Sequence, residues 1–389
     1  MDRRFREDPG SAVFPIVLSK KLCYNKPILS AGRQDVLKLR NLIDIEDLSL
    51  EEWNELYGLA SQIIAHPKEY VDALHGDVMA SLFFEPSTRT NFSFQTAMLR
   101  LGGSVFGFAD PSSSSTSKGE TLKDTVKMVG SYADVIVMRS PKEGAAKAAS
   151  LYAEVPVINA GDGGHMHPTQ TLTDLTTIAS LRGGIGDMNV GLCGDLKNGR
   201  TVHSLIKALA KFPGIRFYLI APRDLAIPGY MIEFMKEHQM PFVEVTNLEA
   251  TMPQLDVLYM TRIQRERFTD PLEYDRLKGV YVLTRTKLKL AKPDLLIMHP
   301  LPRVDEIAQS VDDDPRAVYF EQARYGMFAR MALLMKMVEQ GRRRPEPQVI
   351  GEKPLCRNRN CITQTELYLP NLTKTIGGKT CCAFCDKEI

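Results

Sequence analysis

The stretch Ala80-Ser81-Leu82-Phe83-Phe84-Glu85-Pro86-Ser87-Thr88-Arg89-Thr90 joins a short apolar run to an amphipathic one. Its first half, Ala80–Phe84, predicts a buried strand. Apolar residues then recur at helical spacing from Asn91 to Leu101 and stop at a pair of glycines, which predicts a helix. The polar residues between them therefore lie at a strand-to-helix turn, where the unpaired N–H groups of the first helical turn favour an anion.

Hydroxyl and guanidinium groups are concentrated at this turn, in Ser87, Thr88, Arg89 and Thr90. An arginine can bind a phosphate through two parallel hydrogen bonds, so the tetrapeptide suits a phosphate site. Serine and threonine are also favoured as helix N-caps, whether or not a ligand binds. The tetrapeptide alone leaves both interpretations open, and the rest of the chain favours the phosphate site.

Strand-like apolar runs alternate with helical patterns along the chain, which indicates parallel α/β structure. A helix is expected at Leu48–Ile64 with Ser49 and Glu52 as a capping box, and a long closing helix at Val318–Gln340. We predict two open sheets in preference to a single (β/α)8 barrel. The predicted strands are Ala80–Phe84, Ser104–Phe108, Val135–Met138, Val155–Asn159, Asn189–Cys193, Arg216–Ile220, Val257–Met260 and Leu295–Met298.

Composition places the chain among ordinary globular proteins, with 389 residues, 44% hydrophobic and 25% charged. A net charge of +2 argues against a nucleic-acid partner and a membrane surface. The first ten residues lack the apolar segment of a signal peptide. We therefore expect a cytoplasmic protein.

Cysteines are concentrated at the C-terminal end, where the spacings Cys356-x4-Cys361 and Cys382-x2-Cys385 are typical of a structural zinc site with four thiolates. Cys381 could replace Cys382 in a shifted arrangement. An independent zinc ribbon that binds nucleic acid or protein is the alternative, since the tail is basic and contains Tyr368 and Phe384.

Two further motifs follow predicted strands: His167-Pro168-Thr169-Gln170 and His299-Pro300-Leu301-Pro302. Together with Ser87-Thr88-Arg89-Thr90 they give the chain a resemblance to the aspartate/ornithine carbamoyltransferase family over about residues 30 to 340. The resemblance implies two α/β domains, one for carbamoyl phosphate and one for an amino acid. It also implies a homotrimer with active sites shared between subunits, which could assemble further.

The resemblance sets the expected domain boundaries. They are an N-terminal extension at 1–30, a carbamoyl-phosphate domain at 31–165 with 318–341, an aspartate-binding domain at 166–317, a linker at 342–352 and a zinc domain at 353–389. The last segment resembles the zinc domain of the family's regulatory chain. No counterpart of that chain's nucleotide-binding domain fits in the linker.

The substrate branch is indicated by Pro300, where ornithine enzymes carry a cysteine, and by Arg262-Ile263-Gln264, a pair that suits the second carboxylate of aspartate. The reaction implied is transfer of the carbamoyl group of carbamoyl phosphate to L-aspartate, the step that makes carbamoyl aspartate for pyrimidine synthesis. The alternatives are a transcarbamylase for ornithine or another amino acid, and a non-catalytic, zinc-dependent binding protein.

The resemblance also implies the site residues. Phosphate would be held by Ser87, Thr88, Arg89, Thr90 and Arg139, and the carbamoyl NH2 by Gln170 and the backbone carbonyls of Pro300 and Leu301. Aspartate would be held by Arg200, Arg262 and Gln264, while Lys118 and Ser114 (or Ser113) would come from the neighbouring subunit. We expect direct attack by the amine, no catalytic cofactor, and His203 and His299 in structural roles. The expected catalytic residues are Arg89, Thr90, Lys118, Arg139 and His167.

Overall fold

The computed structural model describes residues 40–263, 265, 270–345 and 356–389. The expected N-terminal extension, most of the expected linker and Gln264 lie outside these ranges. Within the described ranges, no helix is long and apolar enough to cross a membrane.

The first sheet is parallel throughout, in the order β2-β1-β3-β4, with bounds β1 Val78–Phe83, β2 Ser104–Phe108, β3 Val135–Ser140 and β4 Val157–Asp162. Successive side chains of β3 alternate between its two faces. Val135 and Val137 pack in a core with Trp53 of α1, while Ile136 and Met138 pack in a second core with the alanines of α4. The helices of this part are α1 Leu50–Ala65, α2 Thr88–Arg100, α3 Leu122–Gly130 and α4 Ala145–Ser150.

The second sheet is also parallel, in the order β7-β6-β5-β8-β9. Its strands are β5 Met188–Cys193, β6 Ile215–Ile220, β7 Phe242–Val245, β8 Val257–Met260 and β9 Leu296–Met298. The accompanying helices are α5 Pro168–Arg182, α6 Arg200–Leu209, α7 Gly229–Glu237, α8 Leu248–Thr251 and α9 Pro271–Leu277. Short 3-10 helices are η1 Pro67–Tyr70, η2 Pro111–Ser113, η3 Ser115–Lys118, η4 Arg223–Leu225, η5 Met252–Gln254, η7 Lys287–Leu290, η8 Gln309–Val311 and η9 Ile362–Gln364.

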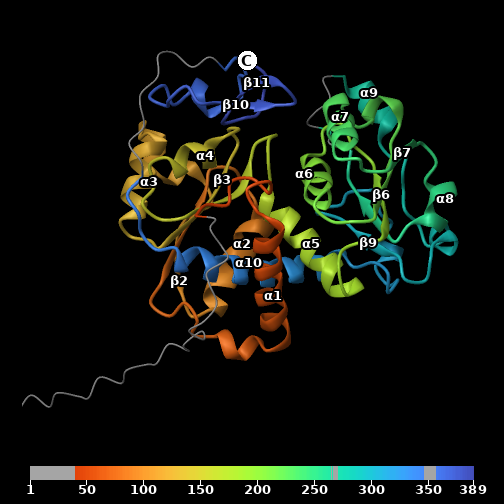
Figure 1. The fold of residues 1–389 in the computed structure, drawn as a ribbon, viewed down its shortest axis with the longest axis horizontal. Helices are drawn as coiled ribbons and strands as arrows, with labels where there is room; N and C mark the ends of the chain where they lie inside the picture. Colours follow the sequence, from red (N-terminus) through yellow and green to blue (C-terminus); the bar gives the residue numbers. More distant parts are fainter. Residues whose placement is uncertain (1–39, 264, 266–269, 346–355) are drawn as a thin grey trace, which may run out of the picture. The chain divides into compact units, whose positions relative to one another are not determined.

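A long helix, α10 Tyr319–Glu339, packs against α1, α2 and α5. Its buried side chains include Met331 and Leu334, which belong to the core that both sheets share. Lys336 reaches Glu55 of α1 at 2.6 Å. The expected closing helix is confirmed, and it runs back across the first half of the chain (Figure 1).

The predicted fold class is confirmed, and the barrel alternative is wrong because the strands form two separate parallel sheets. Each of the eight predicted strands is present within a few residues. The Ser49–Glu52 capping box also forms, with both reciprocal hydrogen bonds. The sequence analysis missed β7, an edge strand in which Glu244 is exposed and no continuous apolar run marks the strand.

The C-terminal residues 356–389 contain an antiparallel hairpin of β10 Thr373–Ile376 and β11 Lys379–Cys382 (Figure 1). This segment, the C-terminal module, contacts the first half of the chain at Glu143. The backbone of Glu143 donates to Asn360 and accepts from Ile362, both at 2.9 Å, and its carboxylate accepts from Asn358 at 2.6 Å. Gly144 follows at φ +83°, where a Cβ would lie 2.5 Å from Phe384. The module therefore packs directly over the start of α4.

Candidate active site

A polar cavity of about 410 Å³ is lined by residues from both halves of the chain. Most of the residues expected at the site line it: Ser87, Arg89, Thr90, Arg139, His167, Gln170, Arg200, Arg262, Pro300 and Leu301. Thr88, Ser114 and Lys118 do not line the cavity, and Gln264 lies outside the described residues. The structure thus gathers ten of the expected residues and leaves Thr88 and the expected partner-supplied pair, Ser114 and Lys118, outside the lining.

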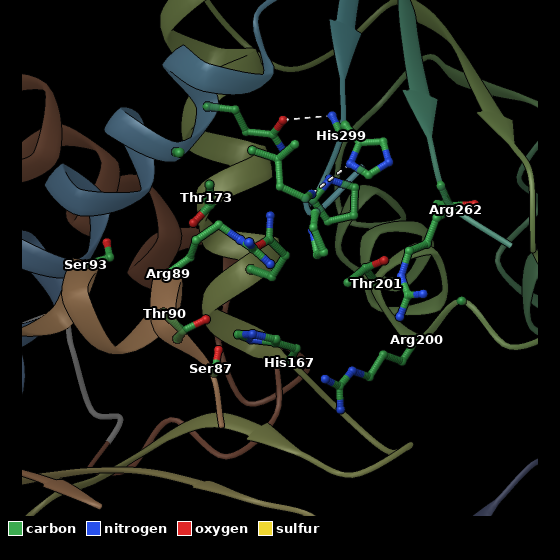
Figure 2. Close-up of a pocket in the computed structure, with 18 of the residues that line it drawn as sticks. Ser87, Arg89, Thr90, Ser93, His167, Thr173, Arg200, Thr201, Arg262 and His299 are labelled. Carbon is green, nitrogen blue, oxygen red and sulfur yellow. Dashed lines mark hydrogen bonds between the residues drawn. The ribbon is translucent and has the colours of Figure 1, made fainter. Parts of the chain in front are cut away.

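The start of α2 forms one wall of the cavity. The helix begins at Thr88, three residues before the helical pattern predicted from Asn91. Ser87 occupies the N-cap position, but its side chain makes no capping hydrogen bond to the helix. A Ser at this position without a capping bond does not support the capping interpretation. The geometry instead leaves the hydroxyl of Ser87 directed at the cavity with Thr90 and Arg89 (Figure 2).

Arg139 is the second-last residue of β3 and lines the same cavity. Its Nε donates to Glu85 at 3.1 Å, and its Nη1 lies 3.4 Å from the carbonyl of Ala160 and 3.5 Å from Nε2 of His167. Burial lowers the pKa of Arg139, although Glu85 counteracts this. Burial and the charge of Arg139 also lower the pKa of Arg89. Two guanidinium groups therefore share a region that favours a multiply charged anion.

His167 is buried at the N-cap of α5, next to Arg139. Burial lowers its pKa well below the usual value, and the charges of Arg200, Arg139 and Arg330 lower it further. The imidazole is therefore neutral at physiological pH and can donate one N–H without carrying charge. A neutral donor beside a guanidinium suits an oxygen that gains negative charge during a reaction.

Gly161 allows this close approach. It has φ +121°, and a Cβ added there would lie 3.0 Å from Nη1 of Arg139 and 3.5 Å from Cδ2 of His167. Only glycine fits this backbone conformation and this space together. The absence of a side chain at Gly161 therefore lets Arg139 and His167 lie close together beside β4.

The opposite wall carries a second cationic group. Arg200 is the first residue of α6, and Arg262 follows β8 after one residue. Figure 2 shows both on the side of the cavity away from Ser87 and Thr90, with His167 between the two groups. Two separated arginine clusters can hold two anionic groups of different molecules side by side.

A turn after β9 completes the cavity. The backbone N–H of Leu301 donates to Nδ1 of His299 at 2.8 Å, and Nε2 of His299 lies 2.7 Å from Glu306. Leu301 has φ +52°, which is uncommon for a residue with a branched side chain and costs conformational energy. His299 therefore stabilises the turn that carries the carbonyls of Pro300 and Leu301. His203 lies elsewhere, between the carbonyl of Leu196 at 2.7 Å and the hydroxyl of Tyr230 at 2.9 Å.

Sequence reasoning missed several residues that line the cavity, above all Arg330 of α10. Arg330 is buried, donates to Ser93 at 3.0 Å and lies over the ring of Phe94 at 5.1 Å. Burial lowers its pKa to about 10. A signal existed, because an arginine in a long apolar helix is costly to bury unless it meets a partner or a ligand. The other missed lining residues include Glu85, Ser93, Thr173, Thr201 and Gln322.

Comparison with known proteins agrees with this geometry. Residues 40–180 match "Aspartate/ornithine carbamoyltransferase, carbamoyl-P binding domain", and residues 186–337 match "Aspartate/ornithine carbamoyltransferase, Asp/Orn binding domain". The aspartate carbamoyltransferase catalytic subunit of Clostridium perfringens is 56% identical over 304 residues, which are 78% of this chain and 99% of that protein. The chain belongs to the aspartate/ornithine carbamoyltransferase family.

Solved structures of family members have the same fold. The catalytic subunit of M. jannaschii aspartate transcarbamoylase superposes with a TM-score of 0.74 at 47% identity, covering 78% of this chain and 99% of that one. Aspartate transcarbamoylase from Trypanosoma cruzi, in complex with carbamoyl phosphate and aspartate, superposes with a TM-score of 0.72 at 41% identity, covering 76% and 96%. The family matches end at residue 337, so the C-terminal module lies beyond them.

The C-terminal module holds a second candidate site. Sγ atoms of Cys356, Cys361, Cys382 and Cys385 all lie within 4.8 Å of one another, and all four residues are buried. The pairs Cys356–Cys385 and Cys361–Cys382 are 3.5 and 3.9 Å apart. Cys381 is outside this group, so a metal could be bound by the four cysteines that the spacing favoured.

Proposed function

We propose that this chain transfers the carbamoyl group of carbamoyl phosphate to the amine of L-aspartate, giving N-carbamoyl-L-aspartate and phosphate for de novo pyrimidine synthesis. The observation that carries the proposal is the cavity with two arginine clusters on opposite walls and a neutral histidine between them. Carbamoyl phosphate and aspartate are both anions, and each cluster suits one of them. The family members that were solved with these two molecules support the assignment.

In this proposal Ser87, Arg89, Thr90 and Arg139 bind the phosphate, and Arg200 and Arg262 bind the carboxylates of aspartate. Thr88 acts through its backbone, because it lies in the first turn of α2, where unpaired N–H groups favour an anion. Gln264, expected to assist Arg200 and Arg262, lies outside the described residues. An ornithine side chain is cationic and would be repelled by both.

Chemistry then proceeds by direct attack. The aspartate nitrogen forms a bond to the carbamoyl carbon, the bond from that carbon to the phosphate oxygen breaks, and the departing phosphate accepts the amine proton. Thr90, Arg139 and His167 donate to the carbonyl oxygen while it carries negative charge. Each such donor contributes about 10²- to 10³-fold to kcat in comparable sites. Cys193 is no competing nucleophile, because it is fully buried and burial raises its pKa.

A homotrimer would complete the site. Lys118 is exposed, and the hydroxyl of Ser114 donates a hydrogen bond to the carbonyl of Pro111 at 2.8 Å. Neither residue lines the cavity of its own chain. Phe92 and Leu99 of α2 are 61% and 62% exposed, which provides an apolar surface for a neighbouring copy. Mixing inactive Lys118→Ala and Arg89→Ala chains should restore part of the activity, because some sites then receive both intact residues. No recovery would argue against shared sites.

The four thiolates suit structural zinc. A tetrahedral site with Zn–S distances of about 2.3 Å requires sulfur atoms about 3.8 Å apart, close to the 3.5 and 3.9 Å separations. When bound, zinc would hold the strands and loops of the C-terminal module together. The module has few core residues of its own, so binding of the metal would contribute directly to its folding.

Arg262 offers a specific test of the substrate assignment. Arg262→Gln should raise the KM for aspartate at least tenfold, as expected when an ion pair to a carboxylate is lost, and leave carbamoyl phosphate binding unchanged. Arg216→Gln, an exposed arginine on β6, is the matched control. An unchanged KM for aspartate in Arg262→Gln would contradict the assignment.

A further inference from the structure

A buried carboxylate, Asp174, lies just behind the cavity and accepts three hydrogen bonds. It is fully buried on α5, one turn after Gln170. Its Oδ1 accepts from Nε2 of Gln170 at 2.9 Å and from Nε2 of Gln322 at 2.7 Å, and its Oδ2 accepts from the hydroxyl of Tyr259 at 2.9 Å. The donors come from α5, α10 and β8. One carboxylate therefore joins three separate elements around the cavity.

The hydrogen bond to Asp174 fixes the orientation of the Gln170 amide. A carboxylate only accepts, so the NH2 group of Gln170 must face Asp174. The amide oxygen of Gln170 is consequently the atom left for the cavity, which this residue lines. An NH2 group on a ligand only donates and requires an acceptor of this kind.

Through Gln322, Asp174 is also linked to the turn after β9. Gln322 donates to Asp174 through Nε2 and accepts from the backbone N–H of His299 through Oε1, at 3.0 Å. Both partners have a fixed polarity, so the amide of Gln322 has one possible orientation. The ring of His299 in turn accepts from the backbone N–H of Leu301 at 2.8 Å; Figure 2 draws the hydrogen bonds of His299 as dashed lines. Three hydrogen bonds thus connect Asp174, through Gln322 and His299, to the turn that carries the carbonyls of Pro300 and Leu301.

Burial and the surrounding donors act in opposite directions on the ionisation of Asp174. Burial raises the pKa of Asp174 to about 7, while Gln170, Gln322, Tyr259 and the charge of Arg330 act in the opposite direction. A buried charge is retained only where donors surround it. Above a pH of about 7 the ionised form of Asp174 predominates, and in that form both of its oxygens only accept hydrogen bonds.

We propose that Asp174 is a positioning residue that makes the carbamoyl end of the cavity present acceptors only, and so selects a carbamoyl phosphate over other acyl phosphates. The inference rests on the proposed function. It adds the reason why an NH2 group is preferred to a methyl group of the same size. Asp174 acts through Gln170 and Gln322, and it does not itself contact the ligand.

The test uses three probes that share a phosphate: carbamoyl phosphate, acetyl phosphate and inorganic phosphate. Titration calorimetry on the full chain gives the Kd of each for wild type and for Asp174→Asn. The asparagine is isosteric, but its NH2 group faces a donor and favours reversal of one glutamine amide. We expect the Kd of carbamoyl phosphate to rise roughly 10- to 100-fold, and the Kd values of acetyl phosphate and inorganic phosphate to stay within about twofold.

Asp256→Asn is the matched control, because Asp256 accepts from the backbone of Asn189 at 2.7 Å and from Lys292 at 2.8 Å, away from the cavity. It should change none of the three Kd values. Gln322→Met is a second variant that keeps Asp174 and removes the link to His299, so the inference stays testable should Asp174→Asn fail to fold. Gln322→Met should also raise the Kd of carbamoyl phosphate without raising the Kd values of the other two probes.

The possible results distinguish the proposed role of Asp174 from the proposed transferase activity. Equal weakening of all three probes would show a packing role and overturn the inference, as would an unchanged Kd for carbamoyl phosphate. Either result leaves the proposed transferase activity intact if wild type binds carbamoyl phosphate. Failure of wild type to bind carbamoyl phosphate would overturn the proposed function together with the inference.

Discussion

Nε2 of His165 lies 3.3 Å from Oδ2 of Asp386, so a loop two residues before His167 forms an ion pair with the C-terminal module. The other ring nitrogen of His165 lies 2.9 Å from Asp162. Although burial acts against it, Asp162 and Asp386 raise the pKa of His165 to about 10. The imidazolium therefore bridges the end of β4 and the segment that follows Cys385.

Removing this bridge should destabilise the protein. His165→Asn leaves the buried Asp162 without its cation, while the partly exposed Asp386 keeps its ion pair with Lys374. Loss of one partner of a buried pair costs about 3–5 kcal/mol. We expect the free energy of unfolding in urea to fall by about that amount. His66→Asn is the control, because the His66–Glu69 pair is exposed and 3.8 Å apart. Equal effects of the two substitutions would contradict the bridge.

Metal content can be assigned to individual cysteines. Cys382→Ser should remove bound zinc and lower Tm, because Cys382 belongs to the four-thiolate group. Cys381→Ser, its neighbour in the sequence, should retain about one zinc per chain by atomic absorption. Retention of zinc by Cys382→Ser with loss from Cys381→Ser would instead support the shifted arrangement of thiolates.

Substitution of Gly161 by alanine adds a single methyl group, yet we expect it to lower kcat. In Gly161→Ala the added Cβ would lie 3.0 Å from Nη1 of Arg139, which must move by a few tenths of an ångström, and the φ of +121° would add backbone strain. Misplacement of a catalytic group by about 1 Å can cost about 10²-fold in rate, so we expect kcat to fall by up to that factor. Gly183→Ala is matched, because Gly183 also has a positive φ, +77°, but nothing lies within 4 Å of its Cβ position. Equal kcat values for the two variants would show that backbone strain alone is responsible.

Stability should fall in mild acid because of His203. Burial lowers its pKa from 6.5 to about 4, and the carbonyl of Leu196 and the hydroxyl of Tyr230 satisfy the neutral ring. Between these pH values the unfolded chain binds a proton that the folded chain does not. The free energy of unfolding is therefore fully retained above pH 6.5 and decreases below it, by at most about 3 kcal/mol.

The measurement for His203 is urea unfolding at several pH values between neutral and mildly acidic. His203→Gln should show a shallower loss of stability with acid than wild type, because glutamine does not titrate. Parallel curves for the two proteins would contradict the prediction.

Much of the fold could be predicted from the sequence because buried parallel strands are continuous apolar runs. Val135–Met138 and Val257–Met260 are examples, and both are strands. The edge strand β7 lacks such a run, since one side of an edge strand meets solvent and its Glu244 is exposed. The start of α2 was placed three residues late, because Thr88, Arg89 and Thr90 belong to the helix without contributing to its apolar face.

Site residues in motifs were easier to predict than their supports. Arg89, His167 and Pro300 lie in recognisable local sequences and all line the cavity. Arg330 and Gln322 lie on α10, about 150 residues beyond α5, and only the packing of α10 on α5 brings them to the cavity. Long-range contacts of this kind leave no local pattern in one sequence.

In the proposed function two anions bind in one cavity, and a carbamoyl group passes from one to the other. The direct measurement follows carbamoyl phosphate labelled with carbon-13 by NMR, with purified protein and either L-aspartate or L-ornithine. We expect the label to move to N-carbamoyl-L-aspartate, with one phosphate released per product, and to stay on carbamoyl phosphate when ornithine is supplied. Transfer of the label to ornithine, or to neither amino acid, would contradict it.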